Sequence, residues 1–319
     1  MAVYTDLTDD ELATLLGAYD LGVARAFKGI AEGVENSNFY LETDAGRFIL
    51  TIFEKRVAKD DLPFFMAVME RLAQKGFPAP QPMPTKGGAL LGEVRGKACA
   101  IVTFLTGVSP RRPNVAQCRA IGVKIAEMHR ALEGFAMTRA NALSVDAWGA
   151  ILRPRLALAD SLSPGLAALI ETDLAALEAT WPTGLPRGII HEDLFPDNSL
   201  FLGDEARGVI DFYFACEDML ALDVAVALNA WAFEPDRSFN LTKGQALIAG
   251  YESVRPLSAA ERAALPTLAR GAALRFLATR LRAWDDTPHG ALVRPKDPLE
   301  YADKLAFHRR ARSAADYGG

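Results

Sequence analysis

Hydrophobic and polar side chains alternate along several segments near the start of the chain, which is the pattern of half-buried β-strands. Residues 23–30 (VARAFKGI), 38–43 (NFYLET) and 47–55 (RFILTIFEK) follow this pattern, and the turn residues at 44–46 (DAG) predict a hairpin between the second and third strands. Apolar residues then recur at helical spacing over 61–74, and two more strands follow, the second over 98–105. We therefore expect a small lobe of about five strands and one helix.

Helical spacing dominates after residue 105, with one β interruption at 188–202 and the short hairpin that follows it. A further helix is expected at the N-terminus, where Thr8 is a suitable N-cap and Glu11 stands three residues on. The chain thus predicts an α+β fold, with an N-terminal lobe at 1–105 and a mainly helical lobe at 106–319. The expected helices of this second lobe are 115–132, 165–181, 219–233, 242–254, 258–284 and 297–315.

Composition and charge narrow the class of protein. The 319 residues carry a net charge of −5, whereas a nucleic-acid binder would show a basic excess. No stretch reaches the roughly 18 apolar residues that a membrane helix needs, and the first residues lack the pattern of a signal peptide. Cys99, Cys118 and Cys216 are scattered, so we expect reduced, buried thiols in a cytoplasmic protein.

The segment HEDLFPDN at 191–198 carries the candidate chemistry. His191, Asp193 and Asn198 fit the H-x-D-x-x-x-x-N pattern of kinase catalytic loops. Phosphoryl transfer needs positioning and charge neutralisation, so Asp193 would accept the proton of the attacking hydroxyl or orient it. His191, the second catalytic candidate, is expected to brace the loop by hydrogen bonding. Asp197 is ambiguous, because after Pro196 it suits a turn as well as a place near metal.

A strand–turn–strand pattern follows at 199–211 and ends in Asp211. Folding this hairpin about residue 205 sets Asn198 almost opposite Asp211, and cross-strand neighbours have Cα atoms about 5 Å apart. An amide oxygen and a carboxylate would then converge, which suits Mg²⁺ held by few protein oxygens together with water and phosphate. The alternative is structural, since an acid before a helix is often a cap and IDF alone could end any strand.

These motifs together resemble the aminoglycoside-phosphotransferase and choline-kinase superfamily, whose fold is similar to that of protein kinases. Within it the chain most resembles the bacterial homoserine kinases built on that fold. HEDLFPDN (191–198) and IDFYFAC (210–216) are the specific matches, and they are supported by GVENSNFYL (33–41), RFILTIFEKR (47–56), 63–82, 208–231, ALRFLATRL (273–281) and KDPLEY (296–301). The resemblance implies two lobes with ATP and Mg²⁺ as cofactors.

By that resemblance, the turn at 29–38 would close over the ATP phosphates, with Gly33, Ser37 and Asn38 as contacts, although it lacks the G-x-G-x-x-G of protein kinases. Thr51 stands where related kinases place a phosphate-pairing lysine. Lys55 is on the same strand face about 13 Å away, and a partner acid could be Asp61 or Glu70. The adenine would meet the backbone of Thr103, Phe104 and Leu105, with Ile49, Ile101 and the Phe104 side chain as possible ring contacts.

The implied acceptor is L-homoserine, whose carboxylate needs a cation and whose ammonium needs acids or carbonyls. Arg275 and Arg280 are the carboxylate candidates, and Tyr213 and Glu217 are candidates for the amine side, with Asp218 beside them. Asp223, an acid in an apolar helix, is expected to brace the catalytic loop because a buried charge must be paired. His129 is expected to be structural.

The expected activity is phosphorylation of L-homoserine to O-phospho-L-homoserine, on the route to threonine, by a cytoplasmic monomer or weak homodimer that binds neither nucleic acid nor membrane. A sibling kinase for choline, an aminoglycoside or a methylthio-sugar is the nearest alternative. For choline, Tyr213, Phe214 and Trp231 would have to form an aromatic cage. A different class of protein, a catalytically inactive nucleotide-binding scaffold, also stays open.

Overall fold

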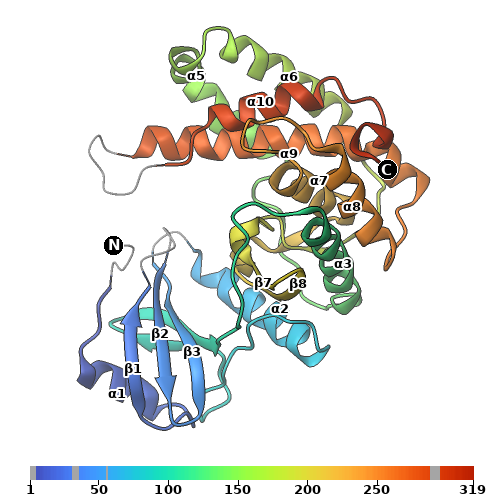
Figure 1. Ribbon diagram of the computed structural model, residues 1–319. Coiled ribbons are helices and arrows are strands. Elements are labelled where there is room, and N and C mark those ends of the chain that lie inside the picture. The colour runs from blue at the N-terminus through green and yellow to red at the C-terminus, as the bar shows by residue number, and fades with distance from the viewer. Residues whose placement is uncertain (1–4, 31–35, 55–56, 288–294) are drawn as a thin grey trace.

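A five-stranded antiparallel sheet forms the N-terminal part of the protein in the computed structural model, which describes residues 5–30, 36–54, 57–287 and 295–319 (Figure 1). Along the chain, helix α1 (Asp9–Gly17) precedes the five strands, and α2 (Leu62–Gln74) lies between the third and the fourth. The strand order is β1-β2-β3-β5-β4, which agrees with the five strands and one helix that the sequence predicts. Their bounds are β1 (Ala24–Gly29), β2 (Ser37–Thr43), β3 (Gly46–Ile52), β4 (Gly92–Val94) and β5 (Lys97–Thr103).

Local signals in the sequence explain these first elements. Thr8 caps α1, and a capping box with Glu11 is formed as predicted. The hairpin between β2 and β3 closes at the pair Thr43↔Gly46, where Gly46 has a φ of 140° that side chains rarely adopt. Strand β5 ends at Thr103, so Phe104 and Leu105 lie beyond it, in the connector to the helical part.

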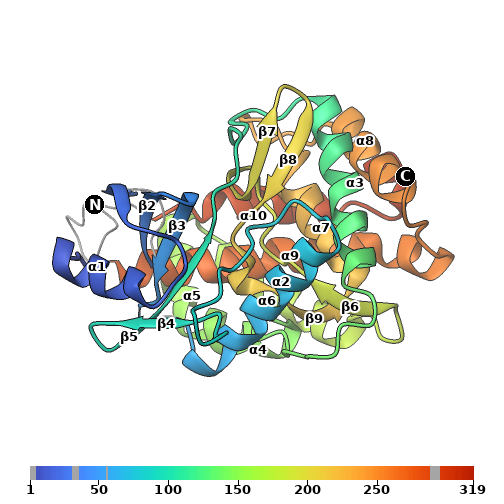
Figure 2. The ribbon, with the colours of Figure 1, turned by 90° about the horizontal axis from the view of Figure 1, so that it is seen from below.

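The rest of the chain is mainly helical, with two small two-stranded sheets (Figures 1 and 2). The predicted helices are present within a few residues, except that the last one ends at His308. Helices α4 and α5 and the pairing of β6 with β9 were not predicted. The elements are α3 (Val115–Ala131), α4 (Val145–Leu152), α5 (Leu156–Leu162), α6 (Leu166–Thr180), β6 (Arg187–Ile190), β7 (Ser199–Leu202), β8 (Glu205–Val209), β9 (Cys216–Met219), α7 (Leu220–Trp231), α8 (Leu241–Glu252), α9 (Ala259–Asp286) and α10 (Leu299–His308).

The two faces of the sheet pack against different partners. Side chains such as Phe39, Leu50 and Ile101 form a small core with α1 on one face. On the other face, α2 belongs to the large core that also contains α3 and α7. Burial of these apolar side chains on both faces stabilises the sheet and joins it to the helical part. Figure 2 shows α2 between the sheet and the helices.

The connector after β5 is attached to the hairpin β7–β8. Val108 exchanges two backbone hydrogen bonds with Phe201, at 2.9 and 3.0 Å. Gly107 and Gly208 permit the approach, because a Cβ at Gly107 would lie 2.7 Å from the Cβ of Leu200 and one at Gly208 would lie 2.9 Å from Leu105 Cδ1. The lobe boundary at residue 105 stays a prediction.

Three further observations concern the molecule as a whole. Helices α3 and α8 cross very closely, since a Cβ at Gly122 would stand 2.1 Å from the carbonyl oxygen of Leu247. The three cysteines are buried and free, as expected. Among the described residues, the helices are too short or too polar to cross a lipid bilayer.

Candidate active site

The segment that carries the H-x-D pattern is a loop between β6 and β7, which we call the catalytic loop (residues 191–198). It leaves β6 after Ile190 and returns through the 3-10 turn Pro196–Asn198. The carboxylate of Asp223, on α7, accepts the backbone N–H groups of His191 at 2.8 Å and of Glu192 at 2.7 Å. The prediction that this buried acid braces the loop is therefore confirmed.

His191 holds the loop from inside. Its ring is fully buried, its Nε2 lies 3.0 Å from the carbonyl oxygen of Ile210, and its Nδ1 accepts the N–H of Asp193 at 3.3 Å. These partners fit a neutral ring that carries its proton on Nε2. Burial lowers the pKa of His191, so the ring stays neutral. His191 thus acts as a positioning residue that ties the loop to the end of the hairpin.

Asp223 is itself held by a chain of buried polar groups. His129 Nε2 lies 3.0 Å from Asp223, and its Nδ1 lies 3.0 Å from the hydroxyl of Tyr251, which accepts from Arg255. Burial raises the pKa of Asp223, but the hydrogen bond and charge of His129 outweigh it and keep the pKa below its usual value. The carboxylate is therefore ionised, and His129 has the structural role that the sequence suggested.

Asp193 and Asn198 meet within the loop. The Asn198 amide Nδ2 donates to the backbone oxygen of Asp193 at 2.8 Å and to its carboxylate at 3.2 Å. The Asp193 side chain keeps 22% of its surface exposed, so it can contact a ligand. Burial raises the pKa of Asp193 to about 7; the charge of Arg275 opposes this shift and that of Asp211 adds to it. Such a pKa suits a group that takes up a proton near neutral pH.

The hairpin brings Asp211 to the same end as Asn198. Ile210 donates its N–H to the carbonyl of Asn198 at 3.0 Å, so Ile210 lies opposite Asn198 across the hairpin. Asp211 therefore stands one residue beyond the position opposite Asn198. The offset from the predicted register arises because the turn closes tightly at 203–204, with Leu202 paired to Glu205. Asp211 is exposed and has a φ of 66°. A non-glycine residue in this left-handed conformation is uncommon and often marks a functional site.

The donor set suits a hard cation such as Mg²⁺. Asn198 Oδ1 accepts no hydrogen bond from the residues that the structure describes, and the neighbouring Asp211 supplies a carboxylate. Within the same described residues, no three His, Cys, Asp or Glu side chains gather into a metal-binding group. Mg²⁺ needs no such group, because it commonly binds through one or two protein ligands with water and phosphate.

Arg275 lies beneath the catalytic loop, in a contact that the sequence did not predict. Its guanidinium is 3.7 Å from both Glu192 and Asp193 and is stacked on the ring of Phe276 at 4.0 Å. The side chain is 3% exposed, and its Nε and Nη2 atoms are buried without hydrogen-bond partners among the described residues. Arg275 therefore balances the negative charge of Glu192 and Asp193, and its guanidinium is not exposed to solvent.

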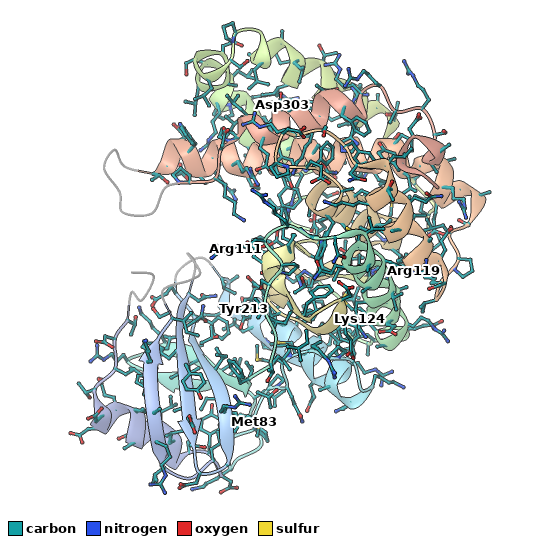
Figure 3. The ribbon with its side chains drawn as sticks, in the orientation of Figure 1. Met83, Arg111, Arg119, Lys124, Tyr213 and Asp303 are labelled. Carbon is teal, nitrogen blue, oxygen red and sulfur yellow. The ribbon has the colours of Figure 1, made fainter. Side chains whose placement is uncertain are left out.

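The other residues expected to bind the substrate already have partners within the protein. Arg280 donates to Glu300 at 2.6 Å and to the carbonyl of Asp297 at 2.8 Å. Tyr213 packs edge-on against Phe53 and Phe65, between the sheet and the helical part (Figure 3). Glu217 lies in β9, paired with Ile189 of β6, and its N–H donates to Arg139. Asp218 accepts from Arg187 and Asn141.

Three of the residues expected to contact ATP share one face of the sheet. Asn38, Ile49 and Thr51 lie on this face; Thr51 donates its hydroxyl to Asn38 Oδ1 at 2.8 Å, and Ile49 packs with the large core. Phe104 contacts the ring of Tyr40 on the same side. Ile101 lies on the opposite face with α1, so the expectation that it contacts adenine is wrong, because successive strand residues point to opposite faces.

Two of the three backbone N–H groups expected to meet adenine already donate hydrogen bonds within the protein. Thr103 N–H donates to the carbonyl of Gln81 at 2.9 Å, and Phe104 N–H donates to that of Arg47 at 3.1 Å. Leu105 N–H has no acceptor among the described residues. Of the three amide groups expected to meet adenine, that of Leu105 is therefore the one left for a ligand.

The residues and ion pairs expected near the phosphate turn are only partly described by the structure, and those described have other partners. Gly33 and Lys55 lie outside the described residues. Ser37 donates to Glu54 at 2.8 Å, and Glu54 also pairs with Lys97 of β5. Neither candidate partner acid is paired with a strand cation, since Asp61 binds Arg139 at 2.7 Å and Glu70 has no ion pair in the described part of the chain.

Comparison with protein families and curated proteins gives consistent matches. The model of the phosphotransferase enzyme family matches residues 26–257. The chain is 58% identical to the homoserine kinase of Xanthobacter autotrophicus over 318 residues, which are 100% of this chain and 99% of that protein. It is also 58% identical to the homoserine kinase of Phenylobacterium zucineum, over 100% of this chain and 98% of that protein.

Solved structures share the fold at much lower identity. An amicoumacin kinase in complex with AMP-PNP and Ca²⁺ has a TM-score of 0.68 and 14% identity, covering 95% of this chain and 92% of that one. A microcompartment-associated aminopropanol kinase has a TM-score of 0.63 and 17% identity, covering 96% and 97% of the two chains. A choline kinase from Cryptosporidium parvum has a TM-score of 0.63 and 14% identity, covering 89% and 88%.

Proposed function

Because this chain belongs to the phosphotransferase enzyme family, and within it to the homoserine kinases, we propose that it transfers the γ-phosphoryl group of ATP to the hydroxyl of L-homoserine. The product is O-phospho-L-homoserine, an intermediate on the route to threonine. The observation that carries the assignment is the full-length identity of 58% to homoserine kinases. The convergence of Asp193, Asn198 and Asp211 at one end of a hairpin supports it.

The reaction needs a group that orients the acceptor hydroxyl and takes its proton as the oxygen attacks phosphorus. Asp193 has this role, because it is the carboxylate of the loop that stays partly exposed next to Asn198. Asn198 fixes its orientation through the two hydrogen bonds from Nδ2. His191 and Asp223 keep the loop in place without contacting the substrate.

Asn198 and Asp211 are the residues that would hold Mg²⁺. When bound, the metal neutralises the phosphate charge and orients the phosphates, as divalent cations do in other phosphotransferases. ATP would lie on the sheet face formed by Asn38, Ile49 and Thr51, with the Leu105 N–H toward the adenine.

Choline is a poorer acceptor candidate because its quaternary ammonium needs an open aromatic cage. Trp231 is 1% exposed and donates its indole N–H to Leu194, and Tyr213 is packed between Phe53 and Phe65. A catalytically inactive scaffold is the alternative from another class. We propose that the protein works in the cytoplasm as a monomer or weak homodimer.

A coupled assay of ADP release with L-homoserine, choline and kanamycin tests the substrate. We expect turnover with L-homoserine, and its absence there would refute the assignment. The variant Asp193→Asn should lose at least about 100-fold in kcat while its Kd for ATP stays close to that of the wild type. Wild-type protein that binds ATP but turns over none of the three acceptors would support the scaffold.

A further inference from the structure

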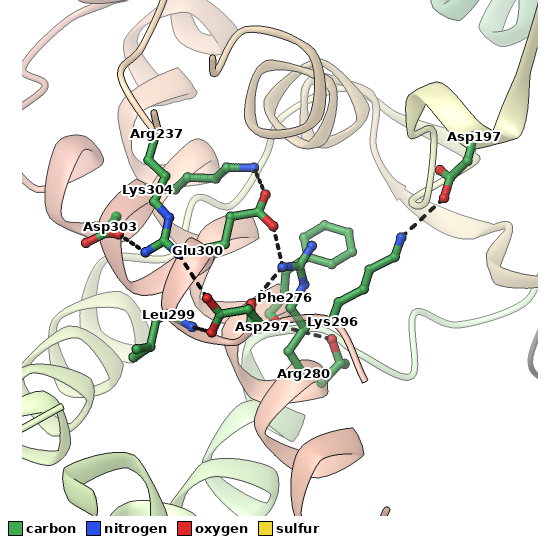
Figure 4. Close-up of polar contacts among 11 residues, drawn as sticks. Asp197, Arg237, Phe276, Arg280, Lys296, Asp297, Leu299, Glu300, Asp303 and Lys304 are labelled. Atoms are coloured by element: carbon green, nitrogen blue, oxygen red, sulfur yellow. Dashed lines mark hydrogen bonds and ion pairs between the residues drawn. The ribbon is translucent and has the colours of Figure 1, made fainter. Parts of the chain in front are cut away.

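The carboxylate of an amino-acid acceptor calls for an accessible cation near the catalytic loop, and neither Arg275 nor Arg280, the two candidates on α9, supplies one. Arg275 is buried between aromatic rings and two acids of the loop. Arg280 is held by Glu300, as Figure 4 shows. Arg280 and Lys304 together outweigh burial and lower the pKa of Glu300 to about 2, so this acid stays ionised and keeps both cations.

A cavity of about 440 Å³ adjoins the catalytic loop on the helical part of the molecule. Its walls include Pro196 of the loop, Arg111 and Arg112 of the connector, and Arg237 and Lys304 near the C-terminal helix. Pro196 is three residues from Asp193, and Ser109 of the connector donates its hydroxyl to the Asp197 carbonyl at 3.2 Å. The connector and the catalytic loop are therefore joined where the cavity begins.

Most charges in this cavity already have partners. Arg237 binds Asp297 and Asp303, and Lys304 binds Glu300 (Figure 4). Lys243 binds Glu234 at 2.6 Å. Arg111 and Arg112 are exposed and have no hydrogen bond or ion pair among the residues that the structure describes. Figure 3 shows Arg111 on the side of the helical part that faces the sheet. Two adjacent cations are thus left for an anionic ligand.

We propose that Arg111 and Arg112, rather than Arg275 and Arg280, bind the carboxylate of the acceptor substrate. The proposal rests on the proposed function, because it assigns one end of that substrate. Guanidinium groups match a carboxylate in geometry and can donate two parallel hydrogen bonds. The cavity is large enough for a small amino acid, and its position next to Pro196 places the bound molecule close to Asp193.

The experiment compares L-homoserine with 3-aminopropan-1-ol, which is homoserine without its carboxylate. For Arg111→Ala and Arg112→Ala we expect kcat/KM for L-homoserine to fall about tenfold or more, mainly through KM, because each loses a charged hydrogen bond. The kcat/KM for 3-aminopropan-1-ol, or its inhibition constant if it is not turned over, should change less than about twofold. Arg119→Ala removes an exposed charge from α3 outside the cavity and is the matched control.

Equal losses for both acceptors, unchanged KM values for L-homoserine, or a rise in the KM for ATP instead would overturn the assignment of the carboxylate to these arginines. Wild-type protein without activity on L-homoserine would overturn the proposed function and this inference together. Active wild type with unaffected arginine variants would overturn this inference alone.

Discussion

Asp223 accepts the backbone N–H of Glu192 at 2.7 Å, so a side chain of α7 fixes the conformation of the catalytic loop. The same carboxylate is 0% exposed. A buried acid that receives several hydrogen bonds cannot be removed without leaving those donors unsatisfied.

Asp223→Ala should lower the free energy of unfolding by about 3 to 5 kcal/mol, because buried N–H groups and His129 lose their acceptor. Urea unfolding measures this loss, and kcat of the folded fraction should fall as well. Glu171→Ala, an exposed acid on α6, is the control and should stay close to wild type. Equal stability of the two variants would contradict the role of Asp223.

Removal of the metal tests the donor pair at the end of the hairpin. EDTA should abolish ADP release and excess MgCl₂ should restore it. In Asn198→Ala and Asp211→Ala, the Mg²⁺ concentration for half-maximal activity should rise about tenfold or more, because each variant removes one of two protein ligands. Variants that keep the Mg²⁺ dependence of the wild type would place the metal elsewhere.

The crossing of α3 and α8 depends on two glycines. A Cβ at Gly250 would lie 2.1 Å from the carbonyl oxygen of Arg119, and Gly122 faces α8 in the same way. Gly122→Ala and Gly250→Ala should each cost more than about 2 kcal/mol of stability, since backbone atoms would have to separate. Gly17→Ala, which meets no atom within 4 Å, is the control in thermal unfolding. Equal Tm values for all three variants would argue against close packing here.

Stability should depend on pH through His308. Burial, and after it the charge of Lys304, lowers the pKa of this ring to about 3. Its Nδ1 lies 2.9 Å from the hydroxyl of Tyr317 and its Nε2 lies 3.0 Å from Asn229 Oδ1, contacts that a neutral ring satisfies. The unfolded chain protonates near its ordinary pKa of about 6.5. Stability from this group is therefore complete above about pH 6.5 and is lost progressively as the pH falls toward about 3.

The variant His308→Gln separates this contribution from other titrations. It should be less stable than the wild type at pH 7, and the gap between them should shrink by about 1 kcal/mol at pH 5.5. A gap in the free energy of unfolding that does not change with pH would show that His308 does not carry the effect.

The sequence predicted the features that depend on neighbours along the chain. Capping of α1 by Thr8, the turn before Gly46 and the hairpin that follows Asn198 are each encoded within a few residues. The catalytic loop was found for the same reason. Its prediction rests on residue types at fixed spacing within eight positions.

Contacts between distant segments could not be predicted in this way. β9 pairs with β6 although its sequence, CEDM, lacks alternation, and the partners are about thirty residues apart. Helical periodicity placed Arg275 on α9, but it does not say which loop the helix meets, so the contact with Glu192 was missed. Likewise, whether Arg111 has an ion-pair partner among the described residues depends on where acids distant in the sequence lie in space.

The backbone pair between Val108 and Phe201 has a mechanical consequence. If the sheet rocks toward the helices as ligands enter, the connector must bend in the few residues between Thr103 and Val108, because the chain beyond them is anchored to β7. If α2 keeps its packing against the helices during such a motion, the chain must bend at both ends of α2 as well, since α2 lies between β3 and β4. The moving part would then be the sheet together with α1, while α2 would keep its position relative to the helices.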